Sequence, residues 1–203
     1  MTDANGCIVS GTVTITEPPA LTASLTASTD ASCNGVCDGE ATVTAGGGTS
    51  PYTYSWTSGG TGVTETGLCA GSYDVTVTDA NGCTITVSVT INEPPALTAS
   101  IVGTDATCNG VCDGSADLTV GGGTSPYTYA WDNTDVTEDI SGLCAGTYNV
   151  TVTDANGCTI TASVTINEPP AIVITSTVVD ATCGASNGSI TATVTGGTSP
   201  YTY

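Results

Sequence analysis

The 203-residue chain contains no Lys, no Arg, no His and no Phe, whereas it carries 19 acidic residues and a net charge of -19. Nucleic-acid binding depends on Lys and Arg against phosphates, so an ordinary nucleic-acid-binding protein is excluded. Docking on anionic lipid depends on clusters of the same residues. No apolar run approaches the length of a membrane span. We therefore expect no nucleic acid among the partners and no membrane insertion.

The missing His and Lys also remove the usual bases that activate a Ser, Thr or Cys nucleophile. A pair of carboxylates could still hydrolyse a glycoside. The acidic residues, however, recur mostly in turns of successive repeats, as at Asp38 and Asp113 and at Asp79 and Asp154. An enzyme seldom needs one site for each repeated unit. We predict no enzymatic activity and no catalytic residues.

Internal repetition is the dominant feature of the sequence. TDANGC begins at Thr2, Thr78 and Thr153, so the copies start 76 and 75 residues apart. Such spacing indicates tandem domains. We predict one or more C-terminal strands of a preceding repeat at 1–19, complete repeats at 20–95 and 96–170, and the N-terminal part of a third at 171–203. The chain is thus read as part of a longer protein, and a missing targeting signal carries no information.

The repeats have the pattern of short strands separated by turns. Ile and Val alternate strictly with Thr and Ser over residues 84–91, which is typical of a half-buried strand. The preceding Asn-Gly favours a tight hairpin. About seven short strands in about 75 residues, with no helical spacing, predict an all-β fold of antiparallel immunoglobulin-like sandwiches. In such a sandwich Trp56 fills the core and Tyr73 occupies the position of a tyrosine corner.

Glu-Pro-Pro follows the last predicted strand at Glu17, Glu93 and Glu168. Pro cannot continue a strand ladder and favours a stiff, extended link. The motif therefore predicts a boundary between domains.

Two longer segments resemble a known family. GGGTSPYTYSW and LCAGSYDVTVTDANGCTITVSVTINEPP, with their second copies, resemble the SprB repeat of gliding-motility adhesins and are similar to polycystic-kidney-disease-type (PKD) domains. The resemblance covers essentially the whole chain. It implies a tandem array of PKD-like sandwiches on very long secreted proteins of the bacterial cell surface, which act as adhesin stalks or filaments. The chain departs from the family pattern at four positions: Cys37, Cys69, Cys112 and Cys144.

The ten cysteines raise a choice between metal sites and disulfides. CNGVCDG, which begins at Cys33 and again at Cys108, has a spacing that zinc sites use. Cys69 and Cys83, however, lie on opposite sides of a whole predicted strand and cannot form a second close pair of ligands. The spacing also differs from the C-x-x-C of redox motifs. Disulfides in an oxidising, extracellular compartment are the favoured interpretation.

The third copy indicates how the cysteines pair. It keeps Cys183 but has Ser186 where the second cysteine falls, so the two cysteines of CNGVC serve separate bonds. In an immunoglobulin-like sandwich the first turn and the corner before the sixth strand lie at the same end. This predicts two bridges inside repeats: Cys37–Cys69 and Cys112–Cys144.

The other cysteines allow two schemes. We favour a bond across the repeat boundary, Cys33–Cys158, with Cys83 and Cys108 bonded to repeats outside the 203 residues. The alternative requires Glu-Pro-Pro to form a tight hairpin, and its bonds are Cys7–Cys33, Cys83–Cys108 and Cys158–Cys183.

Some residues are of types that could bind calcium or a surface polysaccharide. Asp38, Asp79 and Asn81 carry the hard oxygen ligands that calcium prefers, but Asp and Asn are favoured in turns for local reasons. Tyr52, Tyr54 and Trp56 could stack on a surface polysaccharide, although alternating aromatic residues on a strand are more typical of a core. We expect no cofactor, with calcium as the alternative.

The sequence therefore predicts a non-enzymatic structural region of a long secreted adhesin or extracellular filament. It would form a disulfide-stabilised stalk whose partners are the neighbouring repeats of the same chain. Two alternatives stay open. One is a repeat array that binds glycans or calcium, and the other is a filament subunit that assembles by homotypic strand complementation.

Overall fold

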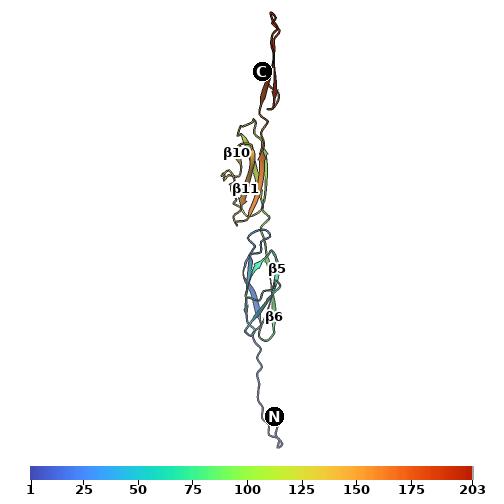
Figure 1. Ribbon diagram of the computed structural model, residues 1–203. Helices are drawn as coiled ribbons and strands as arrows, with labels where there is room; N and C mark the ends of the chain where they lie inside the picture. Colours follow the sequence, from blue (N-terminus) through green and yellow to red (C-terminus); the bar gives the residue numbers. More distant parts are fainter. Residues whose placement is uncertain (203) are drawn as a thin grey trace. The chain divides into compact units, whose positions relative to one another are not determined.

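The computed structural model describes residues 1–202, so Tyr203, the last residue of the predicted third copy, lies outside the described residues. Residues 1–202 form fourteen strands and no helix (Figure 1). Within that range there is accordingly no helix of the length and apolarity that crossing a membrane requires. The chain divides into two compact units, Met1–Glu93 and Pro94–Tyr203. This boundary falls in a Glu-Pro-Pro link, and the predicted division into four segments stays a prediction.

Unit 1 contains two three-stranded antiparallel sheets, with strand orders β1-β2-β4 and β3-β5-β6. Figure 1 labels β5 and β6, which pair along their whole length. The core contains buried residues from both sheets, which is the arrangement of an immunoglobulin-like sandwich. The strand bounds are β1 Thr22–Thr29, β2 Gly39–Gly46, β3 Thr53–Trp56, β4 Thr64–Leu68, β5 Gly71–Thr78 and β6 Thr84–Ile91.

The alternating pattern explains why these segments form strands. Val75 and Val77 of β5 are fully buried, whereas the intervening Thr76 pairs with Thr86 of β6 on the other face. Thr is β-branched and suits this half-exposed surface. The sheets therefore have an apolar inner face and a hydroxyl-rich outer face.

The aromatic residues take the predicted positions. Trp56 is 3% exposed, and its indole N–H donates to the carbonyl of Gly62 at 2.8 Å. The Tyr73 hydroxyl donates to the carbonyl of Cys69 at 3.0 Å, four residues upstream, and so forms a tyrosine corner. The prediction of an all-β immunoglobulin-like fold is confirmed.

The number of strands differs from the prediction, because each repeat has six rather than seven. The segment between β3 and β4 contains several glycines and forms a turn. In this turn the N–H of Gly59 donates to the carbonyl of Trp56, and the N–H of Trp56 donates to the carbonyl of Gly60. Gly59 has a φ of +104°, a conformation that side chains rarely permit.

Unit 2 repeats this architecture and carries part of a third copy. Its sheets have the strand orders β10-β8-β7 and β12-β11-β9, and a further hairpin pairs β13 with β14. The bounds are β7 Thr98–Thr104, β8 Gly114–Gly121, β9 Thr128–Trp131, β10 Ile140–Leu143, β11 Gly146–Thr153, β12 Thr159–Ile166, β13 Val173–Val179 and β14 Ser189–Thr195.

The incomplete copies at either end expose residues that the complete repeats bury. Ile15 is 93% exposed, whereas Ile91, at the equivalent position of the next copy, is 1% exposed. Residues 1–19 contain no strand and only one isolated bridge, Thr2 to Ile8. In the third copy, Ile190 of β14 is 74% exposed.

Candidate functional site

Each complete repeat has a tight turn at the end where the chain enters it. We call this the proximal turn, and it comprises residues 79–83 in unit 1 and 154–158 in unit 2. The buried carboxylate of Asp79 accepts backbone N–H groups from Asn81 at 2.9 Å and Cys83 at 2.8 Å. Its second oxygen accepts the N–H of Thr49 at 3.0 Å. The carboxylate therefore closes the turn and fastens it to the segment that follows β2.

Two glycines allow this close packing. A Cβ on Gly48 would lie 2.8 Å from a carboxylate oxygen of Asp79, and one on Gly47 would lie 2.0 Å from the carbonyl oxygen of Ala20. The N–H of Gly48 donates to the carbonyl of Pro19 at 2.8 Å. The proximal turn thus lies beside the link through which the chain enters the repeat.

The hydrogen bonds also set the ionisation of Asp79. Desolvation raises the pKa of Asp79, but the N–H donors of Cys83, Thr49 and Asn81 outweigh it and hold the pKa below the ordinary value of 3.8. The pKa of Asp154 is lowered in the same way, against desolvation, by the N–H groups of Thr124, Cys158 and Asn156. Both turns therefore contain an ionised carboxylate at neutral pH.

A testable consequence is that stability decreases in acid. A carboxylate whose pKa is lower in the folded state stabilises that state above its unfolded pKa, and this contribution is lost as the pH falls through the folded pKa. We expect the urea midpoint to stay constant above about pH 5 and to fall below about pH 4. Asp79→Asn should flatten this dependence in unit 1. Glu40→Gln, on the exposed face of β2, is the control, and an unchanged pH profile in Asp79→Asn would contradict the assignment.

The opposite end of each repeat carries a loop that we call the distal loop, residues 32–38 and 107–113. The carboxylate of Glu93 accepts the side-chain amide of Asn34 at 2.8 Å and the backbone N–H of Gly35 at 2.7 Å. In unit 2, Glu168 binds Asn109 and Gly110, both at 2.7 Å. The Glu of Glu-Pro-Pro thus anchors the distal loop where the chain leaves the repeat.

Sequence reasoning missed this role of Glu93 and Glu168 and assigned the motif only to a boundary. The partners are 58 and 59 residues apart, so no local pattern links them. The available signal was the joint recurrence of CNG and of Glu in both complete repeats.

The structure contains the two disulfides expected inside the repeats. Cys37 of the distal loop is bonded to Cys69, which follows β4, and Cys112 is bonded to Cys144. The bonded residues are 32 positions apart in both cases. Each bridge therefore links the distal loop to an edge strand of its sheet, which is β4 in unit 1 and β10 in unit 2.

The alternative scheme for the other cysteines is not formed. Each of its three bonds needs at least one member of a group that the structure shows as exposed free thiols, namely Cys7, Cys83, Cys108 and Cys183. Cys33 and Cys158 belong to different units, and their pairing with each other stays a prediction.

The calcium candidates do not lie together. Asp79 and Asn81 share the proximal turn, whereas Asp38 lies in the distal loop and accepts the N–H and hydroxyl of Ser32. These hydroxyl and N–H donors lower the pKa of Asp38. The two ends are separated by β6, which spans about 26 Å at about 3.3 Å per residue. Among residues 1–202, no three His, Cys, Asp or Glu side chains are grouped to hold a metal.

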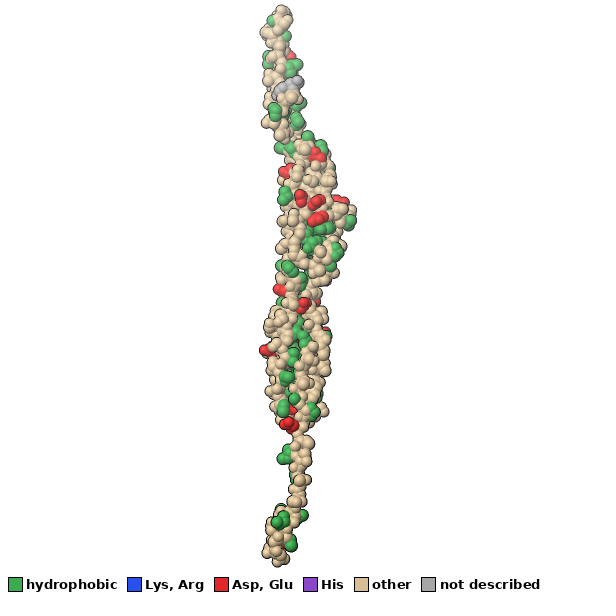
Figure 2. All heavy atoms as spheres, turned by 180° about the vertical axis from the view of Figure 1, so that it is seen from behind, with side chains coloured by type: hydrophobic (Ala, Val, Ile, Leu, Met, Phe, Trp, Pro, Cys, Tyr) green, Lys and Arg blue, Asp and Glu red, His purple; other side chains and the backbone are tan. Residues whose placement is uncertain are grey.

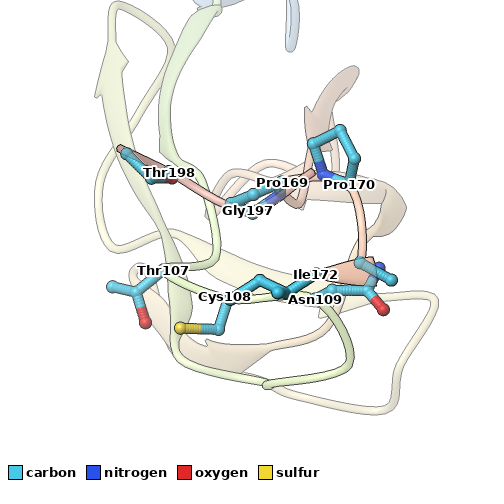
Figure 3. Close-up of a pocket in the computed structure, with 9 residues that line it drawn as sticks. Thr107, Cys108, Asn109, Pro169, Pro170, Ile172, Gly197 and Thr198 are labelled. Carbon is cyan, nitrogen blue, oxygen red and sulfur yellow. The ribbon is translucent and has the colours of Figure 1, made fainter. Parts of the chain in front are cut away.

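Unit 2 also has a pocket where the second repeat is followed by the third copy. Its volume is about 360 Å³. In Figure 3 the distal-loop residues lie along one side, and the residues of the link and third copy complete the lining. The residues are Thr107, Cys108, Asn109, Pro169, Pro170, Ala171, Ile172, Gly197 and Thr198.

Comparisons with solved structures and curated proteins add little to this description. The chain is 17% identical to an amphioxus IgVJ-C2 molecule, over 59% of this chain and 90% of that chain, with a TM-score of 0.28. It is 14% identical to a chain from a structural study of Dscam isoform specificity, over 75% of this chain and 46% of that chain, with a TM-score of 0.31. No curated protein matches the chain.

The comparison with protein families is decisive. The SprB repeat matches at residues 25–61, 100–136 and 175–203, which is once in each complete repeat and once in the third copy. The matched segments include both distal loops and also Thr49 and Thr124, which bind the carboxylates of the proximal turns. Because they make up half of the sequence and recur with its internal period, the chain belongs to the SprB repeat family.

Proposed function

We propose that this chain is a non-enzymatic, tension-carrying region of a secreted adhesin on the bacterial cell surface. The observation that carries the proposal is that the recurring polar side chains fasten the two ends of each sandwich. Asp79 closes the proximal end, and Glu93 with the Cys37–Cys69 bridge closes the distal end. Membership of the SprB repeat family, which occurs in cell-surface proteins, supports this setting.

The strand arrangement suits a chain that is pulled from its ends. β1 enters at the proximal end, β6 leaves at the distal end, and the two strands lie in contact. β1 is paired with β2 along its length. Tension on the link before β1 therefore pulls that strand along β2, so that many hydrogen bonds of the ladder resist together.

The surface chemistry supports a structural role over a binding role. Tyr52 and Tyr54 are half-buried and pack against the core, and the Tyr52 hydroxyl donates to the carbonyl of Gly47. Figure 2 shows acidic side chains spread over several parts of the face in view. With a net charge of -19, neighbouring chains repel each other, which favours separate stalks over bundles.

Calcium removal provides one test. We expect the melting temperature of the full chain to be the same in excess calcium and in EDTA, because backbone N–H groups already bind the carboxylate oxygens of Asp79. Scanning calorimetry measures this directly. A rise in melting temperature with calcium that is lost in Asp79→Asn would favour the calcium-binding array instead.

Location and glycan binding provide the second test. Antibodies against the purified chain should label intact, unpermeabilised cells of the source bacterium. The same chain on a glycan array should give no signal above that of a reduced and unfolded sample. A glycan signal that disappears in Tyr54→Ala, while the fold is retained by circular dichroism, would contradict a purely structural role.

A further inference from the structure

The proximal turn and distal loop each carry a cysteine that is not part of the bridges inside the repeats. Cys83 and Cys158 end their proximal turns, whereas Cys33 and Cys108 lie in the distal loops. In each repeat these two positions are therefore separated by the length of its last strand. A bond inside one repeat between these cysteines is excluded by that distance, since bonded cysteines have Cα atoms less than about 7 Å apart.

Unit 2 shows what faces a distal loop across a repeat junction. Cys108 lines the same pocket as Gly197 and Thr198 of the third copy (Figure 3). The N–H of Gly197 donates to the carbonyl of Pro170 at 2.7 Å, which holds this part of the third copy against the link. A distal-loop thiol thus lies beside the proximal end of the copy that follows.

Thr198 occupies the position that contacts the proximal turn in a complete repeat. Its equivalent in the second repeat, Thr124, donates its N–H to Asp154 at 2.9 Å and accepts the N–H of Ala155 at 2.8 Å. The Thr124 hydroxyl also accepts the side-chain amide of Asn156 at 3.2 Å. A proximal turn on the third copy would therefore sit against Thr198, at the pocket that Cys108 lines.

The proximal turn presents its cysteine in the same way even without a sandwich around it. In residues 3–7, the carboxylate of Asp3 accepts the N–H groups of Asn5 at 2.9 Å and Cys7 at 2.8 Å. Asp154 makes the same two bonds with Asn156 and Cys158, both at 2.9 Å. The turn is a local, self-contained structure with a fixed position for its last residue.

We propose that the distal-loop cysteine of one repeat bonds to the proximal-turn cysteine of the next, Cys33 to Cys158 in this chain, and that tension passes through this bond. The inference rests on the structural role proposed above. In forming the bond, the two thiols lose two protons and two electrons. A small-molecule disulfide such as oxidised glutathione takes them up and leaves as two thiols.

The bond changes which residues carry tension. Cys33 and Cys158 are 125 positions apart, and the segment between them is bypassed. The path that stays under tension after the bond, from Cys158 to Cys183, contains β12, a Glu-Pro-Pro link and β13. Strands already extend about 3.3 Å per residue, close to the limit of the chain. A segment made of such strands can therefore lengthen very little under tension.

Disulfide mapping is the direct test of the bond. The oxidised full chain is alkylated to block free thiols, cleaved at Asp and Glu because it has no Lys or Arg, and analysed by mass spectrometry. We expect the peptide of Cys33 to be linked to the peptide of Cys158. Recovery of Cys33 in alkylated form, or linked to Cys7 or Cys83, would overturn the proposal.

Force spectroscopy on the full chain, held by its ends, tests the consequence. In the oxidised wild type the segment between Cys33 and Cys158 should not contribute to the measured extension. Reduction should increase the extension by about 400 Å. Without reductant, Cys33→Ser should extend further than the oxidised wild type, although the loops closed by Cys37–Cys69 and Cys112–Cys144 stay closed. The matched control Cys83→Ser should behave as the wild type. Equal extension of oxidised wild type and Cys33→Ser would overturn the bypass but leave the structural role intact. Unfolding of both at negligible force would contradict the structural role itself.

Discussion

Replacing Cys37 and Cys69 with Ser in the same chain is expected to lower the free energy of unfolding of unit 1 by about 3–4 kcal/mol. The bridge closes a loop between residues 32 positions apart, and it stabilises the fold by restricting the unfolded chain. Domains of this size are stable by only about 5–15 kcal/mol in total. The loss is therefore a large share of the stability of the repeat.

Urea unfolding followed by circular dichroism measures this effect. Unit 2 keeps its own bridge, Cys112–Cys144, so its transition serves as an internal reference. Cys83→Ser is the matched control, because this thiol is exposed and unbonded in the structure. If the transition of unit 1 stayed in place in the double variant, the bridge would have no role in stability.

Trp56→Ala should have an effect of similar size, about 3–5 kcal/mol. The side chain is 3% exposed and belongs to the core cluster of unit 1, and its indole N–H satisfies the carbonyl of Gly62. Its removal leaves a cavity and an unpaired carbonyl at once.

The variant carries its own reporter. Trp131 becomes the only Trp in the chain, so tryptophan fluorescence reports unit 2 alone, while circular dichroism reports both units. We expect the fluorescence transition to be unchanged and the circular dichroism curve to gain an earlier transition. Trp131→Ala is the mirror-image control, since Trp131 is 4% exposed in the core of unit 2. A shift of the fluorescence transition in Trp56→Ala would show that the units do not unfold independently.

Strands and turns that depend on residues close together in the sequence could be predicted from the sequence pattern. The strict alternation over 84–91 corresponds to β6, and Asn-Gly before it corresponds to the proximal turn. Trp56 and Tyr73 could be placed because a sandwich has one core and one corner of the appropriate kind. The Cys37–Cys69 pair followed from the same architecture together with Ser186 in the third copy.

Features that depend on distant contacts could not be predicted in this way. The buried carboxylate of Asp79 owes its position to the N–H of Thr49, 30 residues away, whereas an Asp in a turn suggests only a local hydrogen bond. Glu93 acts on Asn34 over an even longer separation. The expected number of about seven strands was too high, because the count rested on the typical immunoglobulin-like sandwich and the repeat forms six.

The bridge from Cys37 to Cys69 has one more consequence, for survival outside the cell. The residues between them include β2, β3 and β4, together with the exposed turn that contains Gly59. When an extracellular protease cuts any peptide bond inside this segment, the two fragments stay joined through the sulfur atoms. The chain also has no Lys or Arg for trypsin-like enzymes to recognise. A nicked repeat therefore remains one covalent molecule, and a single cut in this region does not detach whatever lies beyond it.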